Sequence, residues 1–401
     1  MKNKILLGGI LLFGFICPEI QAQQITRLAE LVAVQDTVSP SDTLQSPLKR
    51  KNKVFAYLNR LFHGNVDHTF ERKFDMNFVA APSYTREASF GLGAIMTGLY
   101  RLDRSDSIMQ PSDISIAANA SLLGFYSIVA KGNNLFKGNR ARLSYKVAFT
   151  NKPLNFWGIT YDDCAVNPKS KYTRKQIKWD IDYVYRLTKE FYIGTTSTLN
   201  YADVSKIENA GYLLGQNRTY FFAGLGVLLQ YDTRDFIPNP QRGVYLMLKE
   251  VFYPDFFATF NRNLFATTVI FDVYQKAWEG SVIAVDIYGQ FNNKDLPWPL
   301  REELGTGGVR MRGYYGGRYI DNNQIACQVE LRQHIAGRFG CVVWGGAGTV
   351  FPTLKKFDWA HILPNYGLGL RFEFKHNVNV RVDYGFGKGT SGFVFNFGEA
   401  F

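Results

Sequence analysis

The chain has 401 residues, of which 46% are hydrophobic and 15% aromatic, with 37 glycines and a formal net charge of +12 at pH 7. Beyond the first 22 residues, no run approaches the roughly 18 consecutive apolar residues that a membrane-spanning helix needs, so a helical membrane protein is excluded. The cysteines after that point, Cys164, Cys327 and Cys341, are too few and too scattered for a disulfide framework.

The first 22 residues have the order of a secretory signal peptide. Two lysines precede an apolar run over residues 5–16, and the polar stretch that follows predicts cleavage after Ala22 and export of the mature chain. Cys17 could mark a lipoprotein leader, but Ile16 stands where lipid attachment requires a small residue. Because an exported chain rarely meets nucleic acid, we expect no nucleic-acid partner. The positive charge suits anionic lipid head groups or a lumen lined with arginines.

Residues 23–71 do not have the pattern of a barrel. The segment is rich in Ser, Thr and Pro and then becomes basic, which predicts a non-globular periplasmic linker. Near its end, helical spacing of apolar residues predicts a short amphipathic helix that binds a partner or plugs the barrel. The residues are Val54, Phe55, Leu58, Leu61 and Phe62. A fraying linker that only touches the barrel rim is the alternative.

From residue 72 to residue 401 the sequence predicts a single domain of tilted transmembrane strands. Segments of about ten residues alternate apolar with polar side chains and are separated by turn residues, as in an outer-membrane β-barrel. The sixteen predicted strands cover residues 74–84, 89–100, 113–122, 124–136, 139–149, 175–187, 190–204, 218–231, 242–253, 262–276, 280–292, 323–335, 338–349, 364–375, 377–387 and 391–401. An even number of antiparallel strands fits a bacterial barrel.

The connections between these segments tend to alternate in length. The long ones cover 150–174, 205–217, 293–322 and 350–363, with short turns such as 336–337 between them. If the chain enters from the periplasm, the long connections lie outside the cell.

Side-chain parity favours a membrane barrel over a large soluble β-protein. In 323–335, Glu330 and Arg332 belong to a polar face opposite an apolar one, and in 377–387 the same split places Asp383 inward. The final segment sets four phenylalanines on a common face, which is typical of the C-terminal assembly signal of outer-membrane barrels. They are Phe393, Phe395, Phe397 and Phe401.

The connection 293–322 holds arginines between glycines and aromatic residues. Its motif is Met311, Arg312, Gly313 and Tyr314, followed by Gly317, Arg318 and Asp321. A guanidinium is a rigid, always charged fork of N–H donors, so Arg312 is suited to clamp a carboxylate on the barrel wall. The adjacent glycine lets the backbone approach the wall, and the aromatic ring fills the space around the ion pair.

These residues resemble the BamA/TamA superfamily of outer-membrane barrels. The resemblance implies a sixth extracellular loop that folds back into the lumen, which is the place of 293–322 in the predicted order. It also implies that Arg312 meets acidic side chains on the next two strands. Glu330 matches the first, but Gly346 stands where the second, an aspartate, is expected. Glu373 and Asp383 are candidates to replace it.

One departure from that superfamily concerns the region before the barrel. Most members carry periplasmic polypeptide-transport-associated domains there, and a polar linker of about fifty residues is too short to fold into one with its own core. We therefore expect the receptor module to be absent, and a partner to capture clients instead.

Enzymatic chemistry is not indicated. The five histidines lie in separate segments without metal-ligand spacing, and the two Gly-Leu-Gly stretches neither complete a phosphate-binding motif nor lead into a helix. We expect no catalytic residue, metal or cofactor.

The sequence thus predicts an all-β protein: a sixteen-stranded antiparallel transmembrane β-barrel with an inward-folded sixth extracellular loop and a short N-terminal periplasmic extension. Its expected role is in assembly, insertion or translocation of proteins at the outer membrane, as an accessory subunit. Outer-membrane lipid, client outer-membrane proteins and assembly-machinery subunits are the expected partners. A loop-gated pore for solutes or polypeptides, and a structural scaffold in a larger complex, are the alternatives.

Overall fold

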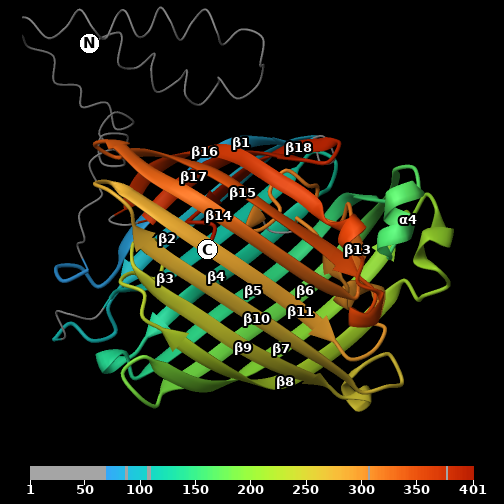
Figure 1. Cartoon of the computed structure of the whole chain (residues 1–401), viewed down its shortest axis with the longest axis horizontal. Helices are drawn as coiled ribbons and strands as arrows, with labels where there is room; N and C mark the ends of the chain where they lie inside the picture. The colour runs from blue at the N-terminus through green and yellow to red at the C-terminus, as the bar shows by residue number, and fades with distance from the viewer. Residues whose placement is uncertain (1–68, 86–88, 106–109, 306–307, 376–377) are drawn as a thin grey trace, which may run out of the picture. The chain divides into compact units, whose positions relative to one another are not determined.

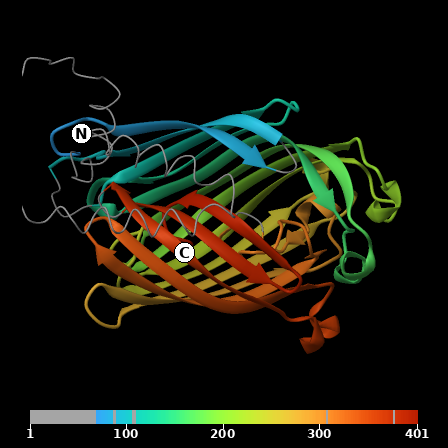
Figure 2. The same ribbon diagram turned by 90° about the horizontal axis from the view of Figure 1, so that it is seen from above.

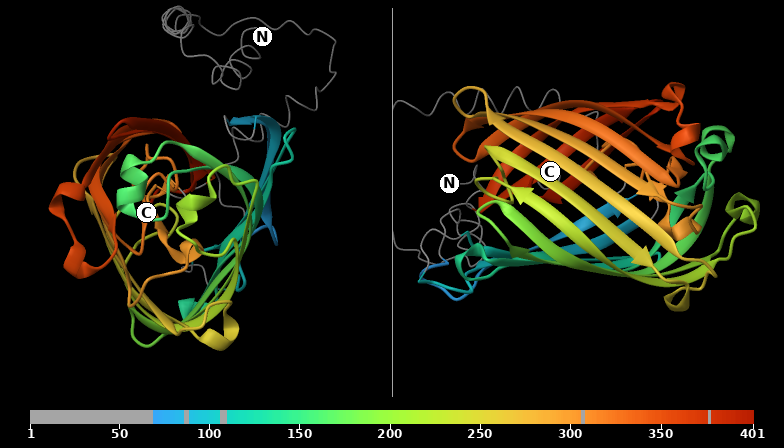
Figure 3. Two further views of the ribbon diagram at one scale, coloured as in Figure 1. Left: turned by 90° about the vertical axis from the view of Figure 1, so that its right-hand side faces the viewer. Right: turned by 60° about the horizontal axis from the view of Figure 1, so that its bottom comes forward.

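The computed structural model describes residues 69–85, 89–105, 110–305, 308–375 and 378–401, which belong to one compact unit, Tyr57–Phe401. In this unit an antiparallel sheet of sixteen strands curls into a barrel (Figures 1 and 3). Within the described ranges no helix is long and apolar enough to cross a membrane. The predicted leader, most of the predicted linker and the helix expected at 54–62 lie outside the described residues.

Each of the sixteen predicted segments forms a strand of the main sheet, so the predicted all-β barrel is confirmed. The strands are β1 (Asp75–Thr85), β2 (Ser89–Tyr100), β3 (Ser112–Ser121), β4 (Tyr126–Leu135), β5 (Ala141–Phe156), β6 (Ser170–Arg186), β7 (Phe191–Ser205), β8 (Thr219–Asp232), β9 (Gly243–Tyr253), β10 (Leu264–Lys276), β11 (Ser281–Asn292), β14 (Asn323–Ala336), β15 (Phe339–Phe351), β16 (Leu363–Lys375), β17 (Val378–Gly387) and β18 (Thr390–Phe397).

Strands of the main sheet pair with their neighbours along the chain, except that β11 pairs with β14. The short strands β12 (Glu302–Glu303) and β13 (Ile320–Asp321) lie between them in sequence and pair with each other. They belong to the connection 293–322, called loop 6 from here on. β1 and β18 are the first and last strands of the pairing order.

The predicted strand boundaries are wrong in two places. The connection predicted at 150–174 is shorter, because β5 and β6 stay paired as far as Phe156 and Ser170. Phe156 packs edge-on against Tyr172 with ring centroids 4.9 Å apart, and both rings are buried, so the extension has apolar packing of its own. The last strand ends at Phe397 rather than at residue 401, because Gly398 adopts a φ of +80° that turns the chain away from the sheet.

Alternation of side chains sets an inner and an outer face. Glu330 and Arg332 of β14 are buried inside the barrel, whereas Val329, which precedes Glu330, is exposed on the outside. Phe393 and Phe395 of β18 are also exposed outward, by 71% and 61%. Apolar side chains on the outer face of a membrane barrel meet lipid, so the predicted parity is confirmed for these positions.

Long and short connections lie at opposite ends of the barrel (Figures 1 and 2). The long-connection end carries α4 (Tyr161–Val166) and short 3-10 helices. These helices are η3 (Ala210–Leu213), η4 (Asp255–Phe257), η5 (Trp298–Leu300), η7 (Leu354–Lys356) and η8 (Trp359–His361), while η2 (Lys137–Asn139) lies between β4 and β5. Seen from the α4 end, the segment between β11 and β14 fills the space inside the ring of strands (Figure 3).

The apolar core lies where loop 6 meets the neighbouring connections. One buried cluster joins Leu304, Met311 and Tyr314 of loop 6 to side chains of β5 to β10 and of the 157–169 connection. Trp298 fastens loop 6 to the connection between β7 and β8, because its Nε1 donates to the carbonyl oxygen of Asn217 at 2.8 Å. Loop 6 is therefore an integral part of the packed interior.

Candidate functional site

Arg312 is the centre of the candidate site, and its side chain is fully buried. Nη1 donates to Oδ2 of Asp383 on β17 at 2.8 Å, and Nη2 donates to Oε1 of Glu330 on β14. The predicted contact with Glu330 is confirmed, and Asp383 supplies the second carboxylate. Hydrogen bonds of this kind between ionised groups are about twice as strong as neutral ones.

Gly346 and Glu373 show why the second carboxylate comes from β17. At Gly346 a Cβ atom would stand 2.4 Å from the carbonyl oxygen of Cys327, so no side chain fits there without a backbone shift. Glu373 pairs with Asn379, four residues along β17 from Asp383, which is about 13 Å in a strand. Of the two predicted substitutes, Asp383 is therefore right, and the position of Glu373 contradicts its assignment as a partner of Arg312.

Trp344 and Asn365 complete the surroundings of Arg312, and neither was predicted from the sequence. The guanidinium carbon lies 3.7 Å from the centroid of the Trp344 ring, in cation–π geometry. Trp344 Nε1 donates to Oδ1 of Asn365 at 3.1 Å, and Nδ2 of Asn365 donates to the carbonyl oxygen of Arg312. Parity was the available signal, because Trp344 shares the inward face of β15 with Gly346.

The backbones of loop 6 and β17 come into contact at two glycines, Gly313 of loop 6 and Gly385 of β17. Gly313 adopts a φ of +105°, a conformation that favours glycine. A Cβ atom on Gly385 would lie 2.3 Å from the carbonyl oxygen of Arg312, and one on Gly313 would lie 2.5 Å from the carbonyl carbon of Gly385. The motif glycine and Gly385 thus allow the close approach that brings Arg312 to the wall.

Tyr314 and Met311 secure the two sides of the arginine. The Tyr314 hydroxyl donates to the carbonyl oxygen of Pro364 at 2.8 Å and accepts from the amide of Lys388 at 2.7 Å, so it bridges β16 and the turn before β18. Met311 is buried and has a φ of +51°, which is uncommon for a residue with a side chain. The hydrogen bonds of Tyr314 and the burial of Met311 therefore hold the loop on both sides of Arg312.

The carboxylates that hold Arg312 also bind further arginines, and together these groups form a closed ring of alternating charges. The contacts run from Arg312 to Glu330, Arg332, Glu399, Arg371, Asp383 and back to Arg312. Their lengths include 2.9 Å from Arg332 to Glu330 and 2.5 Å from Arg371 to Asp383. The ring connects loop 6 to four segments of the barrel.

Glu399, the ring member that follows β18, corrects the prediction for the last residues. Phe401 does not share the outward face of Phe393 and Phe395, because the chain turns inward at Gly398. The Phe401 ring lies 6.2 Å from that of Tyr274, and its carbonyl oxygen accepts from Nη2 of Arg332 at 3.0 Å. Burial raises the pKa of the Glu399 carboxyl, but Arg371 and Arg332 outweigh this effect and hold it below its usual value.

Arg310 makes a second contact between loop 6 and the wall, which was not predicted from the sequence. Its Nε lies 2.8 Å from Oδ2 of Asp286 on β11, and its Nη2 donates to Oδ1 at 2.5 Å. Burial lowers the pKa of Arg310, but Asp286 outweighs it and raises the value overall. Loop 6 is thus held by arginines at two places on the wall.

The second half of the motif contacts the neighbouring outer connection instead of the wall. Arg318 donates to the carbonyl oxygen of Cys164 and lies 5.0 Å from the centroid of Trp157. Asp321 accepts from the amide of Tyr161 at 3.1 Å. Burial raises the pKa of the Asp321 carboxyl, although hydrogen bonds from two amides oppose the rise. Gly317, with a φ of +83°, makes the turn between the two halves.

Cys327 and Cys341 carry free thiols, as does Cys164. Across the described ranges, no three His, Cys, Asp or Glu side chains are placed to hold a metal ion.

Comparisons with known proteins place this chain in a family. The model of the Omp85 superfamily domain matches residues 123–401. CdiB from Acinetobacter baumannii aligns with a TM-score of 0.51 at 11% identity over 81% of this chain, and CdiB from Escherichia coli with 0.51 at 12% over 81%. BamA from Haemophilus ducreyi lacking POTRA domains 1-3 aligns with 0.49 at 12% over 81% of this chain and 69% of that one.

The CdiB likeness shows the fold alone, because the identities are low. The chain spans 60% of the length of each CdiB structure. A search of curated protein sequences finds no significant match.

Proposed function

Because this chain belongs to the Omp85 superfamily, we propose that it assists the insertion or translocation of polypeptides at the bacterial outer membrane, as an accessory subunit. Superfamily members are non-enzymatic transporters and assembly factors that reside in that membrane. The observation that carries the proposal is the position of Arg312 between Glu330 and Asp383, which holds loop 6 against β14 and against β17, the strand that pairs with β18.

The proposed mechanism uses a seam between β1 and β18, the two ends of the pairing order. Unpaired strand edges in lipid cost several kcal/mol for each unsatisfied group, so a barrel that exposes an edge next to a folding client lowers that cost. Support comes from the position of loop 6. The Gly313 carbonyl oxygen accepts from Oγ1 of Thr390 at 3.1 Å, so the loop contacts the first residue of β18 directly.

In the proposed scheme, residues 1–22 are a leader and residues 23–71 are a periplasmic linker. We assign capture of clients to a separate assembly subunit, bound through the apolar residues between Val54 and Phe62. Outer-membrane lipid surrounds the barrel, and no enzymatic step, metal or cofactor is part of this scheme.

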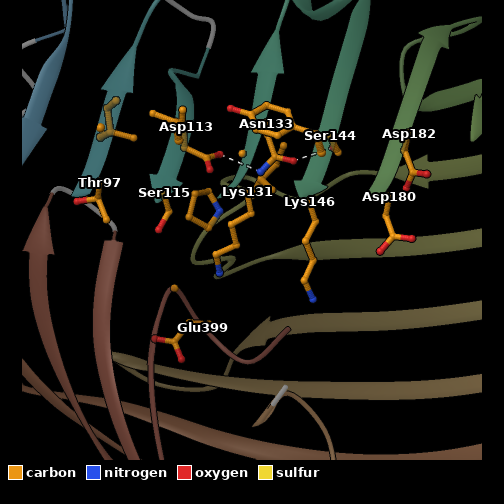
Figure 4. Close-up of a pocket in the computed structure, with 18 of the residues that line it drawn as sticks. Thr97, Asp113, Ser115, Lys131, Asn133, Ser144, Lys146, Asp180, Asp182 and Glu399 are labelled. Carbon is orange, nitrogen blue, oxygen red and sulfur yellow. Dashed lines mark hydrogen bonds between the residues drawn. The ribbon is translucent and has the colours of Figure 1, made fainter. Parts of the chain in front are cut away.

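A loop-gated pore is the second candidate, and one observation favours it. A cavity of about 440 Å³ lies inside the barrel, lined by charged residues of several strands (Figure 4). A lumen with such a lining conducts ions once its constriction opens. A scaffold role in a larger complex is the third candidate.

Reconstitution into liposomes separates these functions. The purified chain is placed in vesicles, and the rate at which an unfolded test barrel inserts is compared with the rate in empty vesicles. We expect faster insertion, and slower insertion for Arg312→Ala than for the unchanged chain. Ion conduction or dye leakage without any gain in insertion rate would support the pore and reject the assembly role.

A cellular test addresses the same proposal. Depletion of the protein is expected to reduce the amount of particular barrels in the outer membrane. Equal growth with an unchanged outer-membrane protein profile would contradict a role in assembly.

A further inference from the structure

Residues Gly398–Phe401, called the tail, lie inside the barrel and are bound there as a ligand would be. The Glu399 carboxylate accepts from Nε of Arg371 at 2.8 Å and from Nδ2 of Asn379 at 2.7 Å, and it lies 3.9 Å from Nε of Arg332. These donors come from β16, β17 and β14, so three strands converge on one carboxylate. Glu399 is almost completely buried by them.

The backbone and the aromatic side chain of the tail are recognised as well. The Gly398 amide donates to the carbonyl oxygen of Asn379 at 2.8 Å. The Phe401 ring stands beside Tyr274 and lies 5.1 Å from the Arg332 guanidinium carbon. A charged group, a main-chain group and an aromatic ring are thus each matched by the wall, which is what specific peptide recognition requires.

The receptor side of these contacts is organised independently of the tail. Arg332 donates to Glu330 at 2.9 Å and Arg371 donates to Asp383 at 2.5 Å, so both guanidinium groups stay fixed when Glu399 is removed. A preorganised site loses little conformational entropy when it binds.

Charge at the site favours an anionic occupant. Four buried arginines (Arg312, Arg332, Arg371 and Arg381) surround Glu330 and Asp383, which gives 4 − 2 = +2 for the wall groups alone, before the tail is counted. Buried charge without a counter-charge is costly, so departure of the tail leaves a strong preference for another carboxylate.

Space for a second chain lies directly beside the tail. The cavity of about 440 Å³ is lined by Gly398, Glu399 and Phe401 on one side. Lys131 and Lys146 extend from the facing wall into the same space (Figure 4). Asp113, Asp180 and Asp182 line this space as well, so the cavity offers a peptide segment room beside the tail, and the preference for a carboxylate comes from the arginines.

We propose that Arg332, Arg371, Asn379 and Tyr274 form a binding site in the lumen for a Glu-x-aromatic peptide segment, occupied here by residues 399–401 and open to a segment of another polypeptide once the tail leaves. The site is independent of the role proposed above. It exists whether the barrel inserts clients, conducts solutes or serves as a scaffold.

The test uses the full-length chain in detergent micelles and a fluorescent peptide of residues 395–401, FNFGEAF, with an amidated end so that Glu399 supplies its only negative charge. Gly398→Val frees the tail, because valine does not tolerate a φ of +80°, while the nearest atom to its Cβ, the carbonyl oxygen of Pro238, is 3.8 Å away. Gly345→Val is the matched control, because its Cβ meets nothing within 4 Å.

We expect the peptide to bind Gly398→Val at least about tenfold more tightly than it binds the unchanged chain or Gly345→Val. The peptide FNFGQAF should bind Gly398→Val at least about tenfold more weakly, because it lacks the charge-assisted hydrogen bonds to arginine. If Gly398→Val does not fold, Glu399→Gln in the full chain weakens the internal occupant without changing the backbone and carries the same expectation.

Equal binding of the two peptides to the freed barrel would overturn the proposal, as would binding no tighter than to the unchanged chain. Peptide binding together with an unchanged insertion rate in liposomes would leave the site established and reject the assembly role alone.

Discussion

At the scale of single residues, the pairing of Arg312 with Glu330 makes a quantitative prediction. Each alanine substitution removes one partner of a fully buried ion pair, so Arg312→Ala and Glu330→Ala should each lower the free energy of unfolding. The double variant should lose less than the sum of the two, with a coupling energy of about 1 to 3 kcal/mol, because the second substitution removes a group that has already lost its partner.

Urea unfolding of the four proteins in the same detergent measures this coupling. Lys189→Ala, in an exposed turn, is the control for loss of a charge. Additive losses from the two substitutions would rule out direct coupling between Arg312 and Glu330.

The residues of this site differ in how far the sequence could predict them. Glu330 was found because the resemblance to the BamA/TamA superfamily implied it and parity placed it inside, and Asp383 was found as an inward candidate for the missing second carboxylate. Trp344 shares their face, but an inward tryptophan on a strand does not by itself indicate contact with a cation. The position of Glu399 could not be predicted from the sequence. It depends on a turn at Gly398, and the alternating pattern of β18 does not indicate that turn.

At the scale of structural elements, the close contact between loop 6 and β17 is possible because glycines, which have no side chain, lie where the two backbones meet. A valine at Gly385 would place Cβ 2.3 Å from the carbonyl oxygen of Arg312, so either loop 6 or β17 would have to move away from this contact. We expect Gly385→Val to expose the loop, with trypsin cleavage after Arg310 and Arg312 faster by about tenfold or more, since cleavage follows the population of the open form.

Gly345→Val again serves as the control, because it adds the same side chain to a strand of the barrel without a contact. Identical cleavage patterns for the two variants would contradict the close contact between loop 6 and β17 at Gly385.

The tail is a second element with a measurable contribution, in this case through pH. Arg371, Arg332 and Asn379 face Glu399 and lower the pKa of its carboxyl overall, although burial and nearby Glu330 oppose them. A carboxyl whose pKa is lower in the folded state stabilises the fold above its unfolded pKa, near 4.5, and this contribution is lost as pH falls through the lower folded value.

The unchanged chain should therefore be more stable than Glu399→Gln at pH 7, and the difference should shrink as the pH falls below about 4.5. Unfolding in urea at a series of pH values measures it. A stability difference that stays constant from pH 7 to pH 3 would exclude ionised Glu399 as its source.

The elements were predicted from the sequence far better than their ends. Alternation over about ten residues is a repeated signal, so all sixteen strands were located. The two boundary errors arise where another interaction takes over, at the paired extension between Phe156 and Ser170 and at the left-handed turn of Gly398. Alternation of apolar and polar side chains predicts a strand with lipid on one face and water on the other. It does not predict a segment that packs inside the barrel.

At the scale of the whole barrel, loop 6 joins two structures that the sequence treats separately. Its first arginines hold the wall through Asp286, Glu330 and Asp383. Its second half holds the outer connection that carries α4, through Arg318 and Asp321. We therefore expect closure of the long-connection end to depend on both halves of the motif.

The second half makes the prediction for closure. Arg318→Ala removes the hydrogen bond to the Cys164 carbonyl oxygen and the contacts with the rings of Trp157 and Tyr319, at 5.0 and 4.6 Å, while the first half of loop 6 stays attached to the wall. The 157–169 connection should then separate from loop 6 more often, and the barrel should conduct more ions in planar bilayers.

We expect a conductance increase of at least about threefold, because cation–π and charged hydrogen-bond contacts of this kind contribute about 1 to 3 kcal/mol to closed states. Lys189→Ala, which removes a positive charge from the short-turn end, should conduct like the unchanged protein. Equal conductance of Arg318→Ala and Lys189→Ala would mean that the end carrying α4 is not the constriction. Closure would then rest on the wall contacts of Arg310 and Arg312.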